Sequence, residues 1–211
     1  MRQVMDVSGA VLQSEREYDI AANTNVSVGA LVKLNKGQVE AASAAATGAL
    51  LGITAEAHTG VEDALNPRNN GTKIIVRDAP GAIFACPAPV LAGKTGGNAT
   101  TVKFKGASGV GANAYDGGFI KDKTGAIRRI SATAETTGDV TLTVDTGSTV
   151  GDGEPFVFFP PVGCTLLGLN TGATNVDATK TGATSVKVVG RDTANNEIWV
   201  MAAKHVLGND Q

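Results

Sequence analysis

Two short apolar runs around a proline-glycine turn indicate the fold class: Lys73-Ile74-Ile75-Val76-Arg77-Asp78, then Ala79-Pro80-Gly81, then Ala82-Ile83-Phe84-Ala85-Cys86. The first run is rich in β-branched residues, which favour strands over helices. Proline and glycine together are typical of a tight turn. The stretch therefore predicts a β-hairpin, introduced by the Asn-Gly turn signal at 69–71.

The same alternation of apolar strands and turn residues continues in both directions from this stretch. Towards the N-terminus, Asn35-Lys36-Gly37 separates a predicted strand at 26–34 from a return strand at 38–42. Further predicted strands lie at 50–55, 102–105, 113–120, 140–144 and 155–160, with a hairpin at 121–130. Few segments carry helical periodicity. We therefore predict an all-β fold made of two small β-barrel or β-sandwich modules with an extended N-terminal arm.

Composition narrows the function classes. The chain has 211 residues and a formal net charge of -2, which disfavours a DNA-coating surface. Alanine, glycine, threonine and valine supply about half of the residues, whereas phenylalanine, tyrosine and tryptophan supply only 4%. A core built from these residues is thin and aliphatic, so a deep aromatic-lined pocket is not expected. The charged N-terminal stretch lacks the apolar run of a secretory signal, so we expect a chain made in the cytoplasm.

Four segments are expected along the chain. Their predicted bounds are an N-terminal arm at 1–25, a first β-module at 26–92, a linker at 93–101, and a second β-module with a hairpin insertion at 102–211. The arm is polar and lacks periodicity, so we expect it to become ordered only on a partner. The linker is glycine-rich. Residues 50–53 are echoed at 166–169 and residues 73–78 at 187–192, which predicts two superposable modules.

Most patterns that resemble catalytic or ligand sites have a simpler interpretation. The glycine pattern at 109–114 lacks a following helix, so it is expected to form a turn rather than a dinucleotide site. Cys86 and Cys164 are expected to be buried free thiols. His58 and His205 lack partners at zinc-ligand spacing and are expected to lie at the surface or at a hinge. No cofactor and no catalytic set is predicted.

For three groups of polar residues, a functional interpretation stays open beside the simpler one. His58 with Glu56, Glu62 and Asp63 is a candidate proton-transfer group, although such clusters are usually solvated. The second group consists of four acidic residues that are a candidate calcium site, although their spacing is not that of a known calcium-binding loop: Asp139, Asp145, Asp152 and Glu154. The third group is the basic hairpin, which serves either as a charged sheet edge or as a dock for an acidic protein surface: Lys121, Lys123, Arg128 and Arg129.

Several segments are similar to phage capsid decoration (cement) proteins and other phage virion structural proteins. The opening pattern lies in 18–20, 28–34, 37–42 and 51–53, and the phrase Asn113-Ala114-Tyr115-Asp116-Gly117-Gly118-Phe119 resembles a strand entry of phage structural proteins. The resemblance covers about the first 55 residues and the region 102–160. This chain is longer than a decoration protein with a single barrel.

The resemblance implies a non-enzymatic protein on the outside of an icosahedral shell, where it bridges major capsid subunits. It implies the major capsid protein as partner, a homo-oligomer with a trimer favoured, and no direct contact with nucleic acid or membrane. Trp199 is expected in the core or at a subunit contact. The candidate contact residues are Tyr18, Ile20, Lys121, Lys123, Arg128, Arg129 and Trp199.

Two other classes stay open at this point. A phage tail-tube or head-fibre component would share the composition and the strand content, and would differ by forming rings or stalks. A carbohydrate-binding β-module is the second alternative, disfavoured because sugar platforms expose aromatic side chains. An enzyme is the least favoured class, because no acid, base and nucleophile set converges in the sequence.

Overall fold

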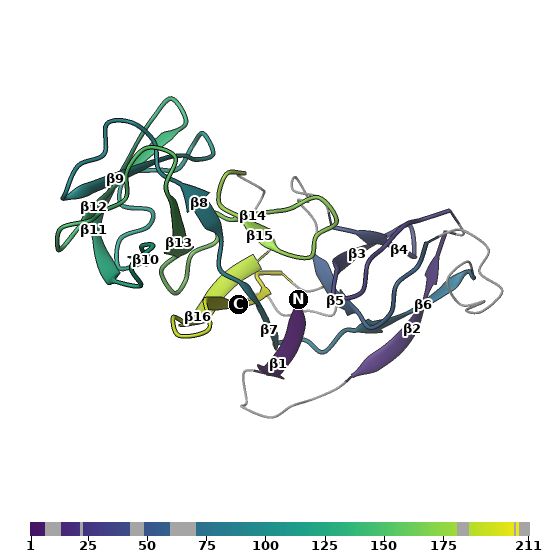
Figure 1. Cartoon of the computed structure of the whole chain (residues 1–211). Helices are drawn as coiled ribbons and strands as arrows, with labels where there is room; N and C mark the ends of the chain where they lie inside the picture. Colours follow the sequence, from purple (N-terminus) through teal and green to yellow (C-terminus); the bar gives the residue numbers. More distant parts are fainter. Residues whose placement is uncertain are drawn as a thin grey trace.

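The computed structural model describes residues 1–6, 14–21, 23–42, 49–59, 71–180, 186–204 and 206. The described residues form strands and turns and include no helix, so the predicted all-β class is confirmed. The strands form a closed barrel, a four-stranded sheet, a six-stranded sheet and a two-stranded hairpin. Figure 1 shows the barrel and the six-stranded sheet as two lobes on opposite sides of the four-stranded sheet.

The barrel closes in the order β2-β4-β3-β5-β6. Its strands are β2 (Glu15–Ile20), β3 (Leu31–Asn35), β4 (Gln38–Ala41), β5 (Leu50–Thr54) and β6 (Lys73–Arg77). Alternate residues point inward and fill the interior with aliphatic side chains, among them Ile20, Val32, Leu51 and Val76. The predicted Asn35-Lys36-Gly37 turn is confirmed, because Asn35 pairs with Gln38 and both turn residues adopt positive φ.

The second lobe is the six-stranded sheet, ordered β8-β13-β10-β11-β12-β9. Its strands are β8 (Val90–Ala92), β9 (Thr101–Lys105), β10 (Phe119–Lys121), β11 (Ile127–Thr136), β12 (Asp139–Val144) and β13 (Pro155–Phe159). Four of the nine aromatic residues gather on its inner side, where Phe104 packs against Phe156 and Phe158, and Phe158 packs edge-on against Tyr115. The predicted hairpin at 121–130 is confirmed, since Lys121 pairs with Ile127.

The four-stranded sheet joins the two ends of the chain, in the order β1-β7-β17-β16. It consists of β1 (Arg2–Asp6), β7 (Ala82–Pro87), β16 (Val186–Asp192) and β17 (Glu197–Ala202), and the small hairpin of β14 (Gly168–Leu169) and β15 (Val176–Asp177) lies beside it (Figure 1). Trp199 is half-buried here and covers Gly190, where a side-chain carbon would lie 2.6 Å from the indole.

The N-terminal segment differs from the expected arm. Strand β2 lies within 1–25, yet it pairs with β6 along five residues and with β4 along two, and so closes the barrel. Strand β1 pairs with β7. Successive residues of a barrel strand such as β2 point alternately to the solvent and to the barrel interior. The exposed residues of β2 are polar, so the segment reads as polar in the sequence although Ile20 is fully buried.

The expected linker and repeat also differ from the structure. Residues 93–101 connect β8 and β9, which are the two outer strands of the six-stranded sheet. Gly93 forms an isolated β-bridge with Phe104 of β9, so these two outer strands lie close together. The two echoed segments occupy unrelated positions, because β5 and β6 belong to the barrel whereas β14 lies in a two-stranded hairpin and β16 at the edge of the central sheet. The predicted repeat is therefore wrong. Frequent glycine and valine produced the similarity.

Candidate functional site

A row of four residues crosses the outer face of the six-stranded sheet. Val90 lies opposite Val157, Val157 opposite Lys121, and Lys121 opposite Ile127, so the four side chains point to the same side. Val90 is 67% exposed and Ile127 is 45% exposed. With strands about 4.8 Å apart, the row spans about 14 Å. We call Val90, Val157, Lys121 and Ile127 the docking row.

A shallow hollow of about 170 Å³ lies along this row. Its lining is predominantly apolar and includes Val90, Val157, Pro155 and Phe156, together with residues 121–123. Single exposed aliphatic residues are common on protein surfaces. Here Val90 and Val157 line one hollow together, whereas Ile127 lies beyond Lys121 at the other end of the row. The sequence analysis missed Val90, Val157 and Ile127, because nothing in the sequence shows which strands lie side by side.

Three of the four predicted basic residues are held by the protein itself. Lys121 donates hydrogen bonds to the Thr193 carbonyl at 3.0 Å and to the Asn196 side chain at 2.9 Å. Lys123 pairs with Glu154, and Arg128 pairs with Asp122 at 3.1 Å. Strands β10 and β11 lie in the interior of the sheet order, so the charged-edge interpretation of this hairpin is wrong.

Asp122 explains why Arg128 is unavailable for docking. Its carboxylate is fully buried at the start of the β10–β11 turn and accepts hydrogen bonds from Thr124, Ala126 and Thr149 in addition to Arg128. Burial opposes the charged form, but these donors outweigh it and lower the pKa of Asp122. Arg128 therefore neutralises a buried charge and stabilises the turn.

Arg129 is exposed, as Lys123 is, but its side chain has no partner among the described residues. Its backbone N–H donates to Asp145 at 3.1 Å. Arg129 lies opposite Phe119 on the same face as the docking row. Arg191, from β16, stacks over the Phe119 ring at 4.2 Å, and burial lowers the pKa of its guanidinium. Two guanidinium groups thus flank one end of the row.

Two other predicted contact residues, Tyr18 and Ile20, are held by the barrel. Ile20 is fully buried in the barrel and offers no surface to a partner. Tyr18 is half-buried and donates its hydroxyl hydrogen bond to Asp78, a fully buried carboxylate that also accepts a bond from Ser14 at 2.7 Å. Arg16 lies 3.5 Å from the same carboxylate. This network fastens β2 to the end of β6, and the sequence analysis did not identify Asp78.

The tyrosine hydroxyls provide a test of this packing. Burial, followed by the hydrogen bond to Asp78, raises the pKa of Tyr18 to about 12, and burial also raises the pKa of Tyr115. We expect no tyrosinate absorbance in the folded protein up to about pH 11, whereas the denatured chain titrates near pH 10. Because the folded pKa of Tyr18 is the higher one, its contribution to stability is complete below pH 10 and is lost as the pH rises towards 12.

The titration is followed by ultraviolet absorbance, with the Tyr18→Phe variant identifying the first transition. A tyrosinate signal near pH 10 in the folded wild-type protein would contradict the Asp78 network. The Tyr115 hydroxyl is buried without a hydrogen-bond partner among the described residues, so it is expected to ionise only when the six-stranded sheet opens.

The remaining polar candidates do not form sites. His58 is buried, contrary to the expected surface or hinge position, and its ring nitrogens lie 2.5 Å from the Thr24 carbonyl and 2.8 Å from the Gly71 carbonyl. It joins two barrel loops. Glu62, Asp63 and His205 lie outside the described residues. Both cysteines are buried free thiols, as predicted, and burial raises the pKa of Cys86 to about 11.

The four acidic residues proposed for calcium are not brought together. Asp139 pairs with Lys94 and Lys105, and Glu154 pairs with Lys123. Asp145 and Asp152 accept backbone N–H bonds from Arg129 and Thr95. Across the described ranges, no three histidine, cysteine or acidic side chains are placed to hold a metal ion. That part of the chain also contains no helix of the length and apolar character that a membrane crossing requires.

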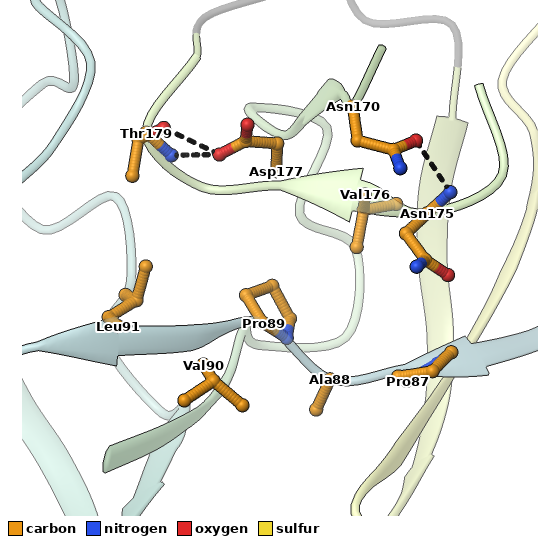
Figure 2. Close-up of a pocket in the computed structure, with 10 residues that line it drawn as sticks. All are labelled: Pro87, Ala88, Pro89, Val90, Leu91, Asn170, Asn175, Val176, Asp177 and Thr179. Atoms are coloured by element: carbon orange, nitrogen blue, oxygen red, sulfur yellow. Dashed lines mark hydrogen bonds between the residues drawn. The ribbon is translucent and has the colours of Figure 1, made fainter. Parts of the chain in front are cut away.

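A larger groove of about 360 Å³ lies where the central sheet continues into the six-stranded sheet. Figure 2 shows the connection Pro87-Ala88-Pro89 and β8 on one side and the β14–β15 hairpin on the other. Its polar side chains largely serve the hairpin: Asn170 accepts the Asn175 N–H, and Asp177 accepts two bonds from Thr179. The groove is therefore interpreted as the seam between two sheets.

Comparison with protein-family models, with curated proteins and with solved structures finds no match in any of the three.

Proposed function

We propose that this protein is a non-enzymatic virion structural protein that binds the outer surface of a phage capsid. In this proposal it bridges major capsid subunits and thereby stabilises the shell. It works without a cofactor and touches neither the nucleic acid nor a membrane. The resemblance of segments within 18–53 to decoration proteins, and of 113–119 to phage structural proteins, supports this assignment, and the decoration family favours a trimer.

The observation that carries the proposal is the exposed docking row. Val90 and Ile127 are exposed at its two ends, and Lys121 lies between Val157 and Ile127. Exposed apolar side chains beside a hollow, with polar residues around them, are typical of protein–protein contact sites.

The arrangement of the lobes supports the bridging role. The barrel and the six-stranded sheet extend from opposite sides of the central sheet (Figure 1). A molecule attached through the outer face of one lobe can therefore present the other lobe to a neighbouring subunit. The rigid Pro87-Ala88-Pro89 connection limits movement where the six-stranded sheet begins.

We expect the purified protein to bind undecorated shells assembled from the major capsid protein of the same phage. Co-sedimentation measures the affinity, electron microscopy locates the added density, and the melting temperature of the shell should rise on binding. Replacing both Val90 and Ile127 by serine should weaken binding by about tenfold or more, since each buried aliphatic side chain is worth roughly 1 kcal/mol or more.

Val28→Ser is the matched control, because Val28 is comparably exposed, at 60%, but lies outside the docking row. It should bind shells like the wild-type protein. Attachment to tail tubes instead of shells, or no attachment at all, would contradict the proposal and favour a tail-tube or head-fibre component or a protein of another class.

A further inference from the structure

The basic residues around the docking row differ in whether a carboxylate compensates them. Lys123 and Arg128 are paired with Glu154 and Asp122. Lys121 is bound by a carbonyl and an amide oxygen, which satisfy its hydrogen bonds without cancelling its charge. Arg129 and Arg191 have no carboxylate partner among the described residues. The face therefore carries an excess of positive charge.

Asp145 lies near these cations, since it accepts the backbone N–H of Arg129 at 3.1 Å. The second carboxylate near them is Asp192, at the end of β16. Its carboxylate accepts hydrogen bonds from the backbone N–H groups of Ala194 and Asn195 and from the Asn195 side chain. These donors lower the pKa of Asp192, and Lys121 adds a weaker electrostatic effect. Two carboxylates face the three cations Lys121, Arg129 and Arg191, so one positive charge remains in excess. The whole chain has a net charge of -2, so this excess is local.

Charge and apolar surface meet at one place on this face. Arg129 follows Ile127 by two residues on β11, so both side chains point outward on the same side of the sheet. Phe119 lies opposite Arg129, and Arg191 covers its ring. The exposed guanidinium of Arg129 thus borders the apolar row. The hollow lies at the β8–β13 end of the row, so a partner segment extended along the row reaches both the hollow and Arg129. Arginine is among the residues that dominate binding energy at protein interfaces.

We infer that the docking row binds a protein segment that combines an apolar side chain, placed in the hollow beside Val90 and Val157, with a carboxylate that pairs with Arg129. This inference rests on the proposed function in one respect only, which is that the partner is a shell protein. A nucleic acid is disfavoured, since phosphate binding requires many cations and gains nothing from an apolar row. Lys121 and Arg191 attract the same carboxylate at longer range.

The test uses fluorescently labelled peptides of alternating glutamate and leucine, read by fluorescence anisotropy. We expect measurable binding that weakens with added salt. A peptide with lysine in place of glutamate should not bind, and neither should one with serine in place of leucine. The Arg129→Glu variant should lose about tenfold or more in affinity, the usual loss when a charged pair is reversed at an interface.

Lys36→Glu provides the matched control, because Lys36 is an exposed cation on the β3–β4 turn of the other lobe. It changes the net charge equally and should bind the peptide like the wild-type protein. Equal binding by Arg129→Glu and the wild type would overturn the inference, and so would tighter binding of a single-stranded oligonucleotide than of the peptide.

The shell assay separates this inference from the proposed function. If the wild-type protein binds shells and Arg129→Glu binds them equally well, the carboxylate contact is wrong and the decoration function stands. If the peptide binds as expected but shells do not, the chemistry of the docking row stands and the partner is another acidic protein.

Discussion

A chain that lacks residues 1–20 should fail to form the barrel. The deletion removes β2, which pairs with both β4 and β6, and takes Ile20 out of the core. It also leaves Asp78 buried without Tyr18, Ser14 and Arg16. Leaving a buried charge unpaired costs about 3–5 kcal/mol, which is a large part of the stability of a typical domain.

Circular dichroism during thermal unfolding measures the effect, and hydrogen exchange locates it in residues 31–77. A chain that lacks only residues 1–6 is the control, because it loses β1 but keeps β2 and the Asp78 network. Its barrel should keep its exchange protection. If the longer deletion melts at the wild-type temperature, residues 15–20 act as a free arm and the barrel closes without them.

The second large effect is expected from Gly52→Ala. Gly52 lies in β5 with φ of +156°, and an added Cβ would lie 1.9 Å from the Arg77 carbonyl oxygen and 3.0 Å from the Asp78 Cα. Both atoms belong to the backbone that continues β6, so no side-chain rotation relieves the clash. The barrel must open locally, and we expect a loss of about 3 kcal/mol, at the upper end for overpacked cores.

For a chain of this length, that loss corresponds to a fall in melting temperature of roughly 6–12 °C. Gly111→Ala is the matched control, because Gly111 is exposed and an added Cβ meets nothing within 4 Å. It should melt within about 2 °C of the wild type. Equal losses in the two variants would show that glycine flexibility, rather than the approach of β5 to β6, determines the effect.

Local patterns sufficed to predict most strands. The apolar run at 73–78 contains β6, and the runs at 82–86, 102–105 and 140–144 contain most of β7, β9 and β12. The turns at 35–37 and between Lys121 and Ile127 also form as predicted. Alternation, β-branching and turn residues act within a few positions of one another, so they are visible in any window of the sequence.

The partners of those strands could not be predicted in the same way. The runs on either side of Pro80 form a turn at Ala79–Ala82 but not a hairpin, because β6 pairs with β2 and β5 whereas β7 pairs with β1 and β17. The predicted hairpin at 72–86 is wrong for this reason. Backbone ladders are chemically alike for any two strands, so the choice depends on which apolar faces pack together.

The candidate site shows the same division. The sequence by itself identified four basic residues near one hairpin and the all-β class that carries them. Only the tertiary structure placed Asp122 and Glu154 against Arg128 and Lys123, left Arg129 exposed, and aligned Val90, Val157 and Ile127 in one row. Charge and hydrophobicity belong to single residues and can be read in order. Whether a charge is paired and whether a side chain is exposed depend on residues from strands distant in the sequence. Those residues become neighbours only once the sheets have formed.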